Sequence, residues 1–140
     1  MIPRAILSVM TDDEFLTAFE DTTLPREEWT HLAHVRMAFL YLTRSPTAAD
    51  ALDEIRRRIQ AYNLSKGNPR GYHETITVAF ARLVDDALRR ESILDFEGLR
   101  AARPDLFASD VLLRFYSRER LYSAEARAVF VEPDGAEALP

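Results

Sequence analysis

The stretch "EWTHLAHVRMAFLYL", Glu28 to Leu42, is apolar around most of its circumference when it is wound as an α-helix. A helix of this kind is buried on more than one side, so it predicts a central element of a helical domain. His31 and His34 lie three residues apart and share one face of this helix. Arg36 falls on another side, where we expect an ion pair with a neighbouring helix.

Most of the remaining chain also has the apolar period and the end signals of helices. Thr11, followed by three acids, predicts a capping box at the start of a first helix. Pro25 should open the helix that contains the quoted stretch, which runs to about Thr43. Two more long helices are expected, one with Ser45 as its cap and Pro46 as its first residue and one from about Tyr72 to Arg90, followed by short ones at Phe96–Ala102, Asp110–Tyr116 and Ser123–Val131.

The sequence therefore predicts an all-α fold, a single-domain helical bundle of four principal helices plus short C-terminal helices. Its 140 residues suffice for one domain with a sizeable core, which we place at residues 1–131. Residues 132–140 form a polar tail that is expected to be flexible unless it folds over another part. The stretch Ala128–Val131 is the one strand-like candidate, and a small C-terminal strand stays open.

Composition limits the classes of partner. The net charge of −5 argues against nucleic acid and anionic membranes, since both require a basic face. The chain has no cysteine, which excludes disulfides and thiolate metal sites. The apolar run in "MIPRAILSVM" is too short for a signal peptide, and Val35 to Leu42 is far shorter than the roughly 20 residues of a membrane span. We expect a soluble, cytoplasmic protein.

The third histidine, His73, lies in "GYHETITVAF", Gly71 to Phe80. On a helix it shares a stripe with Ile76, Thr77, Phe80 and Val84, which should face the core. Antiparallel packing would place His73 opposite His31 and His34. Three neutral imidazoles with an open position suit a catalytic divalent transition metal ion, zinc or iron first, with copper or nickel as further options.

Three nearby groups are candidates for proton transfer at such a site. Glu74 follows His73 directly and could move protons, Glu27 lies four residues before His31 and could ligate the metal or orient a histidine, and Tyr72 could supply a phenol. The run "HETIT" resembles the start of a zinc-protease helix motif, but Thr77 replaces the second histidine, so that interpretation is rejected. A mononuclear site is favoured.

Arginine and tyrosine gather in "LLRFYSRERLYS", Leu112 to Ser123. One hypothesis is that Arg114, Tyr116 and Arg118, together with Arg70, bind an anionic group of a small-molecule substrate. The other, which we favour for the arginine-rich run, is that its arginines form ion pairs with nearby acids and its aromatic rings pack.

Three stretches together, "EWTHLAHVRMAFLYL", "GYHETITVAF" and "LLRFYSRERLYSAEARAVFVEPD", resemble a group of small bacterial proteins of unknown function. That group shares W-T-H-x-A-H, G-Y-H-E-T and a tyrosine- and arginine-rich C-terminal segment ending in P-D. The resemblance covers about Phe15 to Asp134. It implies a helical fold and a histidine-centred site, and it does not specify a metal.

Three hypotheses of function follow. The first is a mononuclear metalloenzyme that hydrolyses a small molecule with metal-bound water, whose pKa is lowered to ~7. The second is an iron- or copper-dependent oxidase or oxygenase at the same site. The third is a non-catalytic ligand-binding or dimerising helical module in which the histidines make buried hydrogen bonds. A homodimer is compatible with each.

Overall fold

The computed structural model describes residues 10–140, and all regular structure in this part is helical. The predicted all-α bundle of four principal helices with short C-terminal ones is confirmed. Residues 1–9, which carry most of the stretch assessed for a targeting signal, lie outside the described part. The α-helices are α2 (Asp12–Glu20), α3 (His31–Arg44), α4 (Ala48–Ser65), α5 (Glu74–Arg90), α6 (Phe96–Ala102), α7 (Arg118–Leu121) and α8 (Ala124–Ala128), with 3-10 turns at Arg26–Glu28, Pro104–Phe107 and Val111–Arg114.

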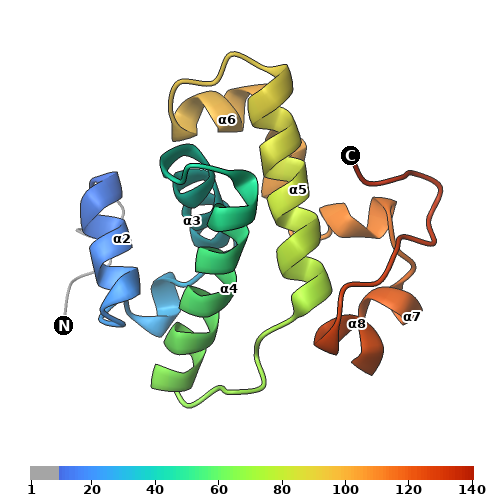
Figure 1. Ribbon diagram of the computed structural model, residues 1–140, viewed down its shortest axis with the longest axis horizontal. Helices are drawn as coiled ribbons and strands as arrows, with labels where there is room; N and C mark the ends of the chain where they lie inside the picture. Colours follow the sequence, from blue (N-terminus) through green and yellow to red (C-terminus); the bar gives the residue numbers. More distant parts are fainter. Residues whose placement is uncertain (1–9) are drawn as a thin grey trace.

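Helices α3, α4 and α5 pack on one another and form the centre of the bundle. Figure 1 shows α2 on one side of this group and α7 and α8 on the other, beside α5. As its apolar circumference predicts, α3 is buried on several sides. Its buried residues include Val35, Phe39 and Leu40. The ion pair expected for Arg36 joins α3 to α2, since its Nη2 lies 2.9 Å from Oδ1 of Asp12.

Hydroxyl side chains decide where the helices begin. The predicted capping box of Thr11 and Glu14 is present. Pro25, however, precedes only a 3-10 turn, and α3 begins after Thr30, whose hydroxyl accepts from the Ala33 N–H. Similarly, Thr47 rather than Ser45 caps α4. A threonine directly before the helix satisfies a free backbone amide, which proline two or more residues earlier does not do.

The later start of α3 changes the surroundings of its histidines. On one continuous helix from Pro25, Glu27 would share a stripe with His31 and His34. Glu27 lies exposed in the 3-10 turn before α3 instead, so this expected stripe is wrong. On a continuous helix Trp29, two residues before His31, would point away from it. It lies before the helix instead, and its ring stacks between His34, at 3.8 Å between centroids, and Phe19, at 4.6 Å.

The segment after Val131 folds back over the turn before α7. Asp134 accepts hydrogen bonds from the backbone and hydroxyl of Ser117, both at 2.7 Å. The Gly135 N–H donates to the Phe115 carbonyl at 2.6 Å, and a Cβ at position 135 would lie only 2.5 Å from that oxygen. Glycine is therefore required for this close approach.

The backbone of the strand-like stretch Ala128–Val131 forms hydrogen bonds with a side chain of α5 and not with a second strand. The Thr75 hydroxyl donates to the Val129 carbonyl at 2.9 Å and accepts from the Val131 N–H at 3.1 Å. Thr75 therefore fixes the backbone of this extended segment to α5, and Arg82 of the same helix lies over the Phe130 ring at 4.7 Å. No helix in residues 10–140 is both long and apolar enough to span a membrane.

Candidate functional site

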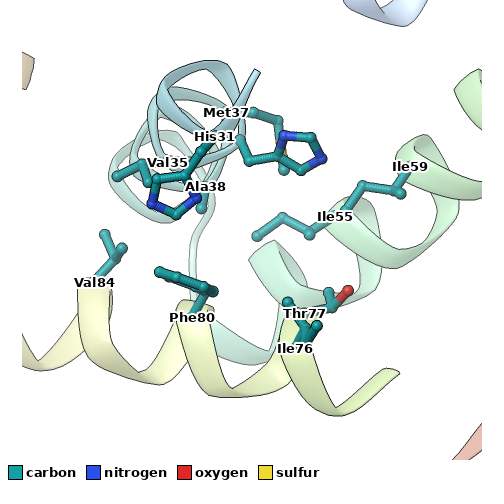
Figure 2. A pocket seen from close by; sticks show the side chains of 11 residues that line it. His31, Val35, Met37, Ala38, Ile55, Ile59, Ile76, Thr77, Phe80 and Val84 are labelled. Atoms are coloured by element: carbon teal, nitrogen blue, oxygen red, sulfur yellow. The ribbon is translucent and has the colours of Figure 1, made fainter. Parts of the chain in front are cut away.

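Two adjoining cavities lie beside the start of α3. The inner cavity, about 80 Å³, is enclosed by side chains from α3, α4 and α5 (Figure 2). Apart from two histidines and Thr77 its lining is apolar, and Figure 2 shows His31 directed toward Phe80 and Val84 of α5. The lining residues are His31, His34, Val35, Met37, Ala38, Ile55, Ile59, Ile76, Thr77, Phe80 and Val84.

The outer cavity, about 280 Å³, adjoins the first on the side of the C-terminal segment. Four residues line both cavities, namely His31, His34, Ile76 and Phe80. The outer wall comes from the chain between the second 3-10 turn and the end of α7: Ser109, Asp110, Leu112, Leu113, Leu121 and Tyr122. The two histidines of α3 therefore lie at the boundary between an apolar chamber and a more polar one.

The tautomer of His31 follows from its hydrogen bond. Its Nε2 lies 2.9 Å from the Leu106 carbonyl oxygen, which can only accept, so Nε2 carries the proton. When the ring is neutral, Nδ1 then holds a lone pair, and it has no hydrogen-bond partner within residues 10–140. The ring meets Phe80 edge-on, with 5.1 Å between centroids.

His34 has the opposite tautomer. Its Nδ1 donates to the Thr30 carbonyl at 2.7 Å, which leaves the lone pair on Nε2. Burial lowers the pKa of His34 to about 4, with a further lowering from His31, and these effects outweigh the Thr30 carbonyl. Thr77 also presents its hydroxyl oxygen as an acceptor, since it donates its proton to the His73 carbonyl at 2.8 Å. At neutral pH His34 and Thr77 thus offer uncharged hydrogen-bond acceptors to the inner cavity.

His73 does not line either cavity. It is the N-cap of α5, and its Nδ1 accepts from the Ile76 N–H at 3.1 Å. Its Nε2 donates to the Leu121 carbonyl at 2.8 Å and so ties α5 to α7. Burial, aided by Arg127, lowers the pKa of His73 despite the Leu121 carbonyl, in keeping with a neutral ring that accepts at one nitrogen and donates at the other.

This placement bears on the predicted metal site. In His73 neither ring nitrogen has a lone pair left for a metal, because one already accepts and the other is protonated. Among residues 10–140 no three side chains of histidine, aspartate or glutamate converge as metal ligands. The described arrangement of His31, His34 and His73 does not fit a three-histidine centre, and we derive no chemistry through a metal ion.

Glu74 and Tyr72 form a separate cluster with α4. The Arg56 guanidinium reaches both carboxylate oxygens of Glu74, with the shortest contact at 2.7 Å, and the Tyr72 hydroxyl donates to Glu74 at 2.5 Å. Burial raises the pKa of Glu74, but the hydrogen bonds from Arg56 and Tyr72 outweigh it and the net shift is downward. Neither residue lines the two cavities, and their contacts join α4 to the start of α5.

The residues expected to bind an anion are also spread out. Arg114 pairs with Glu137 at 2.8 Å and with Asp105 at 3.0 Å, as the ion-pair alternative predicts. Tyr116 is buried and donates to the Val131 carbonyl at 2.7 Å. Arg118 and Arg70 are exposed, and none of the four lines the cavities.

The sequence pointed to the stretch Leu112 to Ser123 as a wall of the site, but through its arginines, whereas Leu112, Leu113, Leu121 and Tyr122 are the residues of this stretch that line the outer cavity. Asp110 and Tyr122 come to the histidines only because the C-terminal segment docks on α5, and no local pattern marks Asp110. Ile55 and Ile59 of α4 lie four residues apart on one helical face, but this spacing alone does not show that a cavity adjoins them. The cap roles of Thr30 and His73 had a usable signal: each residue directly precedes a run of helical period.

The protonation of His34 can be measured directly. Its ring resonances in NMR spectra should titrate near pH 4, whereas histidine in the urea-unfolded chain should titrate near its ordinary value of 6.5. Between these two values the unfolded chain binds more protons, so His34 should make the fold less stable as the pH falls from 6.5 to 4. A folded-state midpoint near 6.5 would contradict the half-buried, neutral ring of His34.

No protein-family model matches this chain, and neither a curated protein nor a solved structure does. Its function is therefore argued from the geometry of the cavities alone.

Proposed function

We propose that this protein binds a small, largely apolar molecule in the inner cavity, with the polar end of that molecule at His31 and His34. The observation that carries the proposal is the combination of a preformed apolar chamber and two imidazoles with opposite tautomers at its boundary. Ligand sites are typically apolar concavities with a few placed polar groups that orient the ligand.

Both tautomers are fixed by backbone carbonyls rather than by solvent. The Leu106 carbonyl holds the proton of His31 on Nε2, and the Thr30 carbonyl holds that of His34 on Nδ1. Each remaining nitrogen is an acceptor, so the preferred ligand carries a hydrogen-bond donor such as a hydroxyl or an N–H group. This proposal develops the ligand-binding hypothesis for the histidines and requires no metal.

The first test compares phenol with anisole, which has a similar ring but no donor hydrogen. We expect phenol to shift the NMR methyl signals of Val35, Met37 and Ile55 and to bind about fivefold more tightly than anisole, the effect of one net hydrogen bond. Equal binding of the two molecules would contradict the role of the imidazoles as acceptors. No change of these signals with either molecule would contradict the proposed cavity site.

A cavity-filling variant locates the binding. Ala38 is buried in the wall of the inner cavity, so Ala38→Leu should fill the chamber and abolish the phenol shifts. Ala61 lies on the exposed face of α4, and Ala61→Leu is the matched control that should bind as the natural chain does. Phenol binding that survives Ala38→Leu would place the site elsewhere.

A further inference from the structure

We infer that the molecule held at His31 and His34 is an organic cation, an amine whose apolar part enters the inner cavity and whose ammonium group lies in the outer one. This inference rests on the proposed function and adds the chemical class of the ligand. It departs from the anionic substrate suggested by the arginine-rich sequence.

The charges around the two cavities all favour a cation. Asp110 is the one aspartate, glutamate, lysine or arginine among the residues that line them; it is exposed, and no ion pair joins its carboxyl group to another residue of 10–140. None of the arginines of the same segment lines either cavity, and Arg114 is occupied by Asp105 and Glu137. An anionic ligand would thus meet a carboxylate and no lining cation, whereas an ammonium group meets a carboxylate that lacks a counter-ion.

The hydrogen-bond chemistry of the boundary leads to the same class. An ammonium group has three N–H donors and no acceptor, and the boundary offers the lone pairs of His31 and His34. Neutral imidazoles do not repel a cation, and the low pKa of His34 keeps its ring neutral at physiological pH.

The aromatic residues of the outer cavity fit an amine as well. Phe80 lines both cavities, and Tyr122, which lines the outer cavity together with Asp110, is 57% exposed. Cations are attracted to aromatic faces through the quadrupole of the ring. The apolar inner chamber, by contrast, would penalise a buried charge, which orients the ammonium group outward.

The experiment compares benzylamine, benzyl alcohol and benzoate, measured by NMR titration at pH 7 and low salt. Benzylamine should bind about fivefold more tightly than benzyl alcohol, as expected for one partly exposed charge pair. Benzoate should bind most weakly. Asp110→Asn should weaken the binding of benzylamine about fivefold, so that the preference for the amine over benzyl alcohol is lost, and 1 M NaCl should reduce the preference in the natural chain.

The control is Asp50→Asn on the exposed first turn of α4, which removes the same charge away from the cavities and should keep the preference for the amine. If benzyl alcohol binds as tightly as benzylamine, or if Asp110→Asn keeps the preference, the cation assignment is overturned while the proposed binding site stands. If none of the three molecules binds and phenol does not bind either, the proposed function itself is overturned.

Discussion

Replacing His73 by alanine is expected to lower the free energy of unfolding by about 3 kcal/mol, the largest effect of a single substitution that we predict. The substitution removes the cap of α5, because the Ile76 N–H loses its acceptor. It also leaves the Leu121 carbonyl without its donor at a buried contact between α5 and α7. Urea unfolding followed by circular dichroism measures the change.

His73→Asn separates the two roles of the ring. Asparagine is a good N-cap residue and can accept from the Ile76 N–H, but its side chain is too short to reach the Leu121 carbonyl as well. We therefore expect His73→Asn to be more stable than His73→Ala by about 1 kcal/mol and less stable than the natural chain. Equal stability of all three chains would contradict the structural role of His73.

A chelator tests separately whether His73 belongs to a metal centre. If His73 acts only as a cap and an anchor, EDTA should leave the urea midpoint of the purified natural chain unchanged. A metal centre that includes His73 would instead bind metal in a defined ratio, and EDTA would lower the midpoint to that of the His73 variants.

Replacing Thr75 by valine is expected to destabilise the fold by about 2 kcal/mol, although the two side chains have nearly the same shape. Thr75 is 0% exposed, and its hydroxyl makes both hydrogen bonds that fix Val129 and Val131 to α5. Valine leaves the buried Val131 N–H without a partner. Urea unfolding measures the loss, and hydrogen exchange should show faster exchange of the Val131 amide.

Thr43→Val is the matched control, since it removes a hydroxyl that bonds only to carbonyls of its own helix, those of Phe39 and Leu40. Thr43 is exposed, so we expect a change within about 0.5 kcal/mol. If Thr75→Val is as mild as Thr43→Val, or if the Val131 amide keeps its slow exchange, the docking role of Thr75 is wrong.

One sequence motif makes the hydrogen bonds that hold the C-terminal segment against α5. The stretch "GYHET" supplies the cap and anchor His73 and the docking residue Thr75, and its partners lie in the C-terminal segment. The stretch "GYHET" and the C-terminal segment, which the resemblance groups by sequence pattern alone, are thus in direct contact although they lie about 50 residues apart. Their joint role is to hold one wall of the outer cavity against α5.

The periodicity of apolar residues was enough to predict the helices and the core face of α3 and α5. Ile76, Thr77, Phe80 and Val84 do face the inner cavity with His31 and His34, because residues three and four apart share a face of any helix. The helix starts were harder to place. Helix α5 begins at Glu74 and not at Tyr72, and α3 begins at His31 and not at Pro25. His73 and Glu27 therefore lack the positions within a helix that the sequence predicts, since a residue at or before the cap does not follow the helical period.

The sequence by itself determined an all-α bundle with two histidines on an inward stripe, since helix formation and burial depend on local spacing. Only the tertiary structure decided that the proton of His31 lies on Nε2, that His73 anchors α5 to α7, and that Asp110 adjoins the histidines. These features depend on backbone carbonyls and side chains that lie 48 to 75 residues away or that reach the site when the C-terminal segment docks. The spacing of residues along the chain does not predict such contacts, because they form only when separate segments pack.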